Sequence, residues 1–89
     1  MYKLKNGFII REIGNQFMAV PIGKQTSEIH GMIALSESGK LLWHTLEKGA
    51  TVDDLAKTLT ENYEVEYDVA LKDAQNFVQA LTEQGALDL

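Results

Sequence analysis

The chain of 89 residues contains no cysteine and only one proline. Without cysteine it can form neither a disulfide framework nor a thiolate metal site. A chain this short must be stabilised by one hydrophobic core, so we expect a single domain over residues 1–89. A signal-like apolar N-terminus and an apolar run of membrane-spanning length are also missing. We therefore expect a cytoplasmic protein with no membrane partner.

Basic residues are scarce as well. Eight Lys and Arg stand against 13 Asp and Glu, which gives a formal net charge of −5. The acidic excess is concentrated in residues 61–89, where Lys72 is the only base. Binding to a phosphate backbone needs clustered Lys and Arg, so this balance counts against a nucleic-acid partner. The acidic third is interpreted as a solvated helix face.

Constellations that carry chemistry are absent from the sequence. The two histidines, His30 and His44, fall on different expected elements, whereas a metal site needs converging ligands. Ser36 and Ser38 precede His44, but helix capping accounts for Ser36, and a catalytic nucleophile needs an oriented base beside it. We therefore expect a protein that is not an enzyme and has no catalytic residue, no metal and no cofactor.

The first part of the chain is predicted to form a sheet. Apolar, β-branched runs indicate strands at three ranges: 7–14, 17–23 and 30–35. Gly14 and Asn15 suit a tight turn between the first two strands. Pro21 lacks a backbone N–H and should lie at an edge, a bulge or a strand end.

After Leu35 the apolar period becomes helical. Ser36 fits the N-cap of a first helix, and Gly49 fits its C′ position. Thr51 is predicted to cap a second helix, in which Asp54 can complete a capping box. Because strands precede helices instead of alternating with them, the expected class is α+β.

The third helix is expected from about Asp68 to Gln84. Gly85 should end it, and the last four residues should trail. Apolar residues at helical spacing predict which side of each helix faces the core. They are Leu42, Trp43 and Leu46 in the first helix; Val52, Leu55, Ala56 and Leu59 in the second; and Ala70, Leu71, Ala74, Phe77, Val78 and Leu81 in the third. Trp43 has two interpretations, a large core ring or an anchor for a partner, and we favour the core.

The junction "LSESGKLLW" at residues 35–43 resembles the motif of the PqqD-like proteins, which runs Leu-Asn-Glu-Thr-Gly and then, after a few residues, to an apolar residue and Trp. Leu35, Glu37, Gly39, Leu42 and Trp43 match it. "TVDDLAKTLTENYEV" and "DAQNFVQALTEQGAL" are similar to the family's second and third helices. "FIIREIGNQFMAVPIG" looks like its N-terminal hairpin.

The resemblance implies a winged helix-turn-helix-like domain with a three-stranded antiparallel sheet followed by three helices. Such domains are recognition elements for RiPPs, which are ribosomally made and post-translationally modified peptides. They capture the leader of a precursor peptide by strand addition and present it to a modifying enzyme. In PQQ biosynthesis that enzyme is a radical S-adenosylmethionine protein. A precursor peptide and such an enzyme are therefore the expected partners.

The residues of this chain are compatible with that mechanism, because an exposed strand edge can template an incoming strand. Gly31 would let another backbone approach closely, and Met32 is an adaptable contact. The predicted peptide-binding residues lie on the third strand and on one flank of the third helix: His30, Gly31, Met32, Ile33, Ala34, Asp73, Asn76, Phe77 and Ala80. The alternative for each of the four helix residues is an ordinary core or surface position.

Two other functions compete with peptide binding. A winged-helix DNA-binding regulator is permitted by the fold, but the acidic balance and the lack of a basic recognition helix oppose it. A small hydrolase or transferase is opposed by the residue inventory. The exposed edge also leaves a homodimer open, formed by strand exchange.

Overall fold

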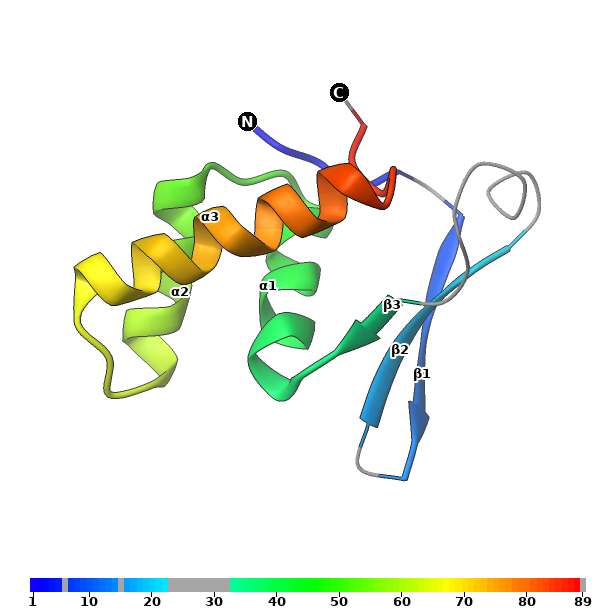
Figure 1. The fold of residues 1–89 in the computed structure, drawn as a ribbon, viewed down its shortest axis with the longest axis horizontal. Helices are drawn as coiled ribbons and strands as arrows, with labels where there is room; N and C mark the ends of the chain where they lie inside the picture. Colours follow the sequence, from blue (N-terminus) through cyan, green and yellow to red (C-terminus); the bar gives the residue numbers. More distant parts are fainter. Residues whose placement is uncertain (6, 15, 23–32, 89) are drawn as a thin grey trace.

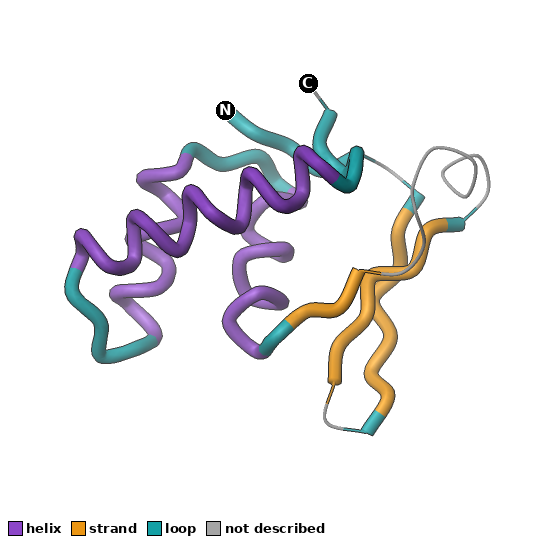
Figure 2. Tube along the Cα trace, viewed as in Figure 1, coloured by secondary structure: helices purple, strands orange, loops and turns teal. Residues whose placement is uncertain are grey.

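The computed structural model describes residues 1–5, 7–14, 16–22 and 33–88. Three strands are followed by three helices (Figure 1): β1 (Phe8–Ile13), β2 (Gln16–Pro21), β3 (Ile33–Leu35), α1 (Glu37–Glu47), α2 (Val52–Asn62) and α3 (Tyr67–Glu83). The predicted α+β class and the order of the elements are confirmed. Figure 2 shows the sheet standing to one side of the helices, and none of the described helices is long and apolar enough to cross a bilayer.

The strands form one antiparallel sheet in the order β1-β2-β3. Ile13 pairs with Gln16, so a two-residue loop closes the first hairpin. Gly14 has a φ of 64°, which confirms its predicted role in a tight turn, while Asn15 lies outside the described residues. Pro21 ends β2, where its missing N–H disturbs the ladder least.

Side-chain caps begin the first two helices, as predicted. The Ser36 hydroxyl accepts a hydrogen bond from the backbone N–H of Gly39 at 3.1 Å. The Thr51 hydroxyl accepts one from the Asp54 N–H at 3.1 Å, and the Asp54 carboxylate accepts one from the Thr51 N–H at 2.9 Å. Gly49, with a φ of 90°, follows the C-cap residue Lys48 of α1 and so takes the C′ position.

The core lies among the helices and against one face of the sheet. Trp43 is only 2% exposed, and its ring stands edge-on to Phe8 with centroids 5.2 Å apart, which confirms it as a core ring. The other buried apolar side chains within the strands and helices come from every element but β1: Ala19, Leu35, Leu42, Leu46, Leu55, Ala56, Leu59, Ala70, Ala74, Val78 and Leu81. Leu71, Phe77 and Val52 are half-buried at the border of this core.

The two ends of α3 differ slightly from the prediction. The helix begins at Tyr67, one residue before the predicted start. The sequence did not mark this position, because the N-cap residue Glu66 makes no side-chain hydrogen bond. The residues after Gly85 do not trail. Ala86 and Leu87 are almost fully buried, and Leu87 forms a bridge with Leu4.

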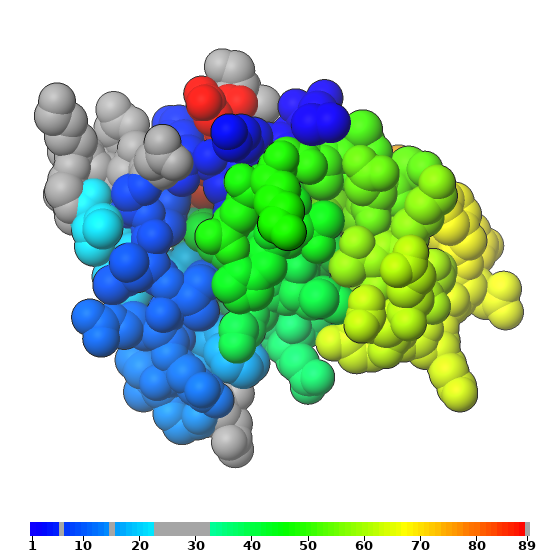
Figure 3. All heavy atoms as spheres, turned by 180° about the vertical axis from the view of Figure 1, so that it is seen from behind, coloured from blue at the N-terminus to red at the C-terminus, as the bar shows by residue number. Residues whose placement is uncertain are grey.

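The N-terminal segment is the reason that the C-terminus is ordered. Tyr2 and Ala50 exchange two backbone hydrogen bonds, of 2.7 and 2.8 Å, and the Lys5 N–H donates to the Ala86 carbonyl at 2.9 Å. Figure 3 shows this segment lying across the end of α1 on the far side of the molecule. Residues from both ends of the chain thus close the core together.

Candidate peptide-binding groove

A groove of about 390 Å³ opens where the end of β3 and the first turn of α1 meet α2 and α3. Its floor is apolar and comes from five parts of the chain: Leu35, Leu42, Leu59, Val65 and Phe77. Its rim is polar: Ser36, Ser38, Tyr63 and Asp73. An apolar floor with a few polar groups around it is typical of a binding site.

The junction between β3 and α1 builds one wall of the groove. Gly39 lies in the first turn of α1, and a Cβ atom there would come within 3.3 Å of the Ser36 Oγ and 3.5 Å of the Phe77 ring. The contact with Phe77 would be ordinary, whereas the contact with Ser36 would be tight, so the missing side chain leaves room for the capping hydroxyl. The glycine of the junction motif therefore accommodates the N-cap of α1 beside the groove.

The free edge of β3 borders this groove. β3 pairs with β2 on one side, and no other described strand lies on its second side. It is the strand closest to the helices in Figure 1. Ala34 is exposed and lines the groove, whereas Leu35 is buried. An edge of this kind presents backbone N–H and C=O groups to an incoming strand.

The structure brings three of the predicted site residues together. Ala34 from β3 and Asp73 and Phe77 from α3 all line the groove. Asn76 and Ala80 are exposed on α3 but do not line it. Contact with a peptide stays a prediction for all of these residues.

The remaining predicted residues lie on or before β3. Ile33 is half-buried and packs against the core. His30, Gly31 and Met32 lie outside the described residues. Their role in binding therefore also stays a prediction.

Two lining residues from the α2–α3 connector were not predicted. Tyr63 caps the C-terminus of α2 and is 37% exposed, and Val65 follows it in the same connector. The signal was available, because an aromatic and a β-branched residue stand out in the polar segment "YEVEYD". Periodicity cannot detect such residues, since they belong to no helix or strand face.

Asp73 dominates the electrostatics of the groove. It is the one charged side chain among the described residues that line it, and it makes no hydrogen bond or ion pair with another described residue. Lys40, next to the groove-lining Gly39, lies instead over the Phe17 ring with its Nζ 4.2 Å from the centroid. The groove therefore keeps a negative charge at its rim.

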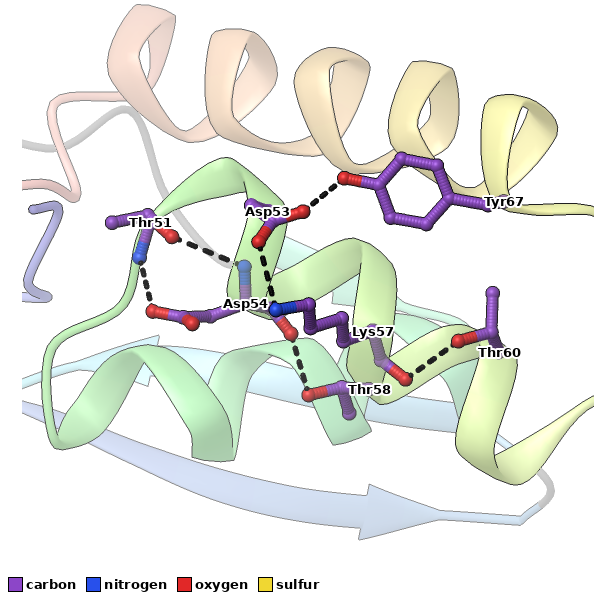
Figure 4. A network of polar contacts seen from close by, with 7 residues as sticks. All are labelled: Thr51, Asp53, Asp54, Lys57, Thr58, Thr60 and Tyr67. Atoms are coloured by element: carbon purple, nitrogen blue, oxygen red, sulfur yellow. Dashed lines mark hydrogen bonds and ion pairs between the residues drawn. The ribbon is translucent and has the colours of Figure 1, made fainter.

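A second polar cluster joins α2 to the start of α3 and is separate from the groove (Figure 4). The Tyr67 hydroxyl donates to Asp53, and the Lys57 ammonium lies 3.1 Å from the same carboxylate. The tyrosine hydrogen bond and then the lysine lower the pKa of Asp53. These side chains bind one another, so we interpret the cluster as structural. No group of three or more metal-ligating side chains gathers within the described ranges.

Comparisons with known proteins agree with this geometry. A family model described as "Coenzyme PQQ synthesis protein D (PqqD)" matches residues 23–87, well over half of the chain. No curated protein matches.

Two solved structures share the fold with a TM-score of 0.75. One, "TbiB1 in Complex with the TbiA(beta) Leader Peptide", is 20% identical, with 97% of this chain and 94% of that chain covered. The other, "Lasso peptide synthetase B1 complexed with the leader peptide", is 23% identical, with 99% and 98% covered. At these identities the likeness shows a common fold.

Proposed function

The chain belongs to the PqqD family, and from this we propose that it is a peptide-binding module that captures the leader of a ribosomally made precursor peptide. The observation that carries the proposal is the apolar groove beside the free edge of β3. Two proteins of the same fold have been captured with leader peptides, which supports the same use of the fold here.

In the proposed complex the peptide adds as a fourth strand along β3 and rests its side chains on α3. Hydrogen bonds between the two main chains provide affinity, and the groove selects side chains. Leu35 and Leu42 are buried, so the floor is held by the core and needs little ordering when the peptide binds. The module supplies binding and no catalytic group, and the chemistry belongs to the modifying enzyme.

The modifying enzyme is the second proposed partner, and a radical S-adenosylmethionine protein is the candidate that the family suggests. We propose that residues 1–89 act as one binding domain that presents the peptide to it. A homodimer formed through the same edge should be dissociated by the peptide, because both occupants need β3.

DNA binding gains no support from the residues. α3 carries Asp68, Asp73 and Glu83 against the single base Lys72, whereas a recognition helix needs a basic surface. The helix that would enter a groove of DNA is therefore negatively charged.

Chemical-shift mapping tests the proposal. The probe is a peptide selected against the protein from a displayed random library of about twelve residues, a length that spans roughly 40 Å when extended and so matches the 38 Å longest dimension of the molecule. We expect the largest amide shifts in Ile33–Leu35 and around Asp73 and Phe77. Shifts confined to α2, with β3 and α3 silent, would contradict strand addition.

A pair of charge-introducing variants separates binding from folding. Ala34→Asp places a carboxylate in the groove from an exposed position, so the fold should persist while binding weakens at least about tenfold. Lys57→Asp, on the exposed face of α2, is the control and should bind like the unmodified protein. Equal losses in both variants would point to a surface effect unrelated to the groove.

A further inference from the structure

The groove carries two different recognition groups on the same stripe of α3. Asp73 and Phe77 are four residues apart, so they lie one above the other on one helix face, about 6 Å apart along the axis. Phe77 is half-buried and offers an apolar ring surface. Asp73 is exposed and has no partner among the described residues.

An extended peptide has the matching repeat. Its side chains alternate between faces, and two residues on the same face are about 6.6 Å apart. A peptide that lies along α3 with a bulky apolar side chain on Phe77 therefore places the residue two positions away beside Asp73. A Lys or Arg at that position would reach the carboxylate with its charged end while its aliphatic stem covers the apolar floor.

Nearby bases do not neutralise Asp73. Lys40 lies over the Phe17 ring at 4.2 Å. Lys72 is the sequence neighbour of Asp73, and adjacent positions on a helix do not face each other. A cation in the peptide therefore meets the charge of Asp73 at the rim of the groove.

We propose that this protein selects leader peptides in which a Lys or Arg lies two residues from a bulky apolar residue, with Asp73 as the specificity-determining residue and Phe77 as the apolar support. The inference rests on the proposed function and adds the chemical class of the peptide. The apolar contact provides most of the burial, and Asp73 decides which apolar segments are accepted.

Selection from the same random library tests the inference directly. Pools are selected in parallel on the unmodified protein, Asp73→Lys and Gln75→Lys, and then sequenced. The unmodified protein should enrich Lys and Arg two positions from a bulky apolar residue, and Asp73→Lys should exchange this preference for Asp and Glu. Gln75→Lys is the matched control, because Gln75 is exposed on α3 and lines a different hollow with Tyr2 and Val52. It should keep the original preference.

Affinity measurements on one selected peptide complete the test. Asp73→Asn should weaken its binding about fivefold, the size expected for a partly exposed ion pair. Replacing the basic residue of the peptide with Gln should cost the same, and the two changes together should cost no more than one alone. Additive losses would overturn the pairing.

The possible failures are distinguishable. Peptides that are rich in apolar residues and shift β3 and α3, but show no basic preference or keep it with Asp73→Lys, would overturn this inference and leave the proposed function standing. A library that yields no peptide bound at the groove would overturn both.

Discussion

The helices and the sheet of this protein bury their residues to very different degrees. α2 and α3 each hide a regular stripe, such as Leu55 and Leu81 at 0% and 1% exposure. β1 has no buried residue, and β2 has only Ala19. Ile13, at the end of β1, is 63% exposed. The core of the protein is therefore largely helical, and the sheet is an appendage attached to it along one face.

This difference has a functional meaning in the proposed complex. A strand that accepts a partner strand needs unpaired backbone groups along one edge. The helices must therefore leave that edge uncovered. Leu35 is buried and anchors the end of β3 to the helices, while its neighbour Ala34 stays exposed in the groove. In the proposed complex, Leu35 would therefore serve stability and Ala34 would serve binding.

Trp43→Ala gives the largest expected effect and tests where the stability resides. Trp43 connects the two regions through its contact with Phe8, so its truncation should lower the free energy of unfolding by about 3–5 kcal/mol. Urea denaturation measures this. The counterpart in the sheet, Ile13→Ala, should cost less than about 0.5 kcal/mol because Ile13 is exposed. Similar losses in the two variants would refute the contrast.

Residues that act through local backbone geometry, such as a helix cap or a turn glycine, should contribute similarly to the free energy of unfolding in both regions. Thr51→Ala removes the α2 cap and should cost about 1 kcal/mol of unfolding free energy. Gly14→Ala, in the sheet, should cost about the same, because a side chain at a φ of 64° is strained although a Cβ there meets no atom within 4 Å. Thermal melts of the two variants make the comparison, and a loss several times larger in one region would show that burial also controls these positions.

Acid should lower the stability of the protein through two carboxylates of the helical region. This is the smallest of the expected effects. The Thr51 backbone N–H lowers the pKa of Asp54, and the Tyr67 hydroxyl lowers that of Asp53, both from 3.8. Because the folded pKa values lie below the unfolded ones, this stabilisation is present above about pH 4 and is lost as the pH falls through the lower folded values. The melting temperature of Asp54→Asn should therefore decline less between about pH 4 and pH 2 than that of the unmodified protein. Parallel declines would contradict it.

Tyr67 should contribute to the dependence of stability on pH at the alkaline end. Its hydrogen bond to Asp53 raises its pKa above 10.0, so its contribution is full below pH 10.0 and is lost as the pH rises through the folded value. Tyr67→Phe should flatten this alkaline decline. An unchanged alkaline limb would mean that the contact between Tyr67 and Asp53 is not formed in solution.

Much of the fold could be predicted from the sequence because its signals are local. Ser36, Thr51 and Gly49 mark helix ends through hydrogen bonds and backbone angles that involve only nearby residues. The apolar stripes and the core position of Trp43 follow from helical periodicity. The start of α3 was misplaced by one residue for the same reason, since Glu66 provides no side-chain cap.

The sequence by itself determined the order of elements, the helix caps, the candidate core and the family, all of which depend on residues close together in the chain. Only the tertiary structure decided what forms the groove. Gly39 and Phe77, or Val65 and Ala34, are far apart in sequence and line the same groove because the fold brings β3, α1, the α2–α3 connector and α3 around it. The burial of Leu87 against the N-terminal segment was decided in the same way, because a contact between the two ends of a chain leaves no periodic pattern in either.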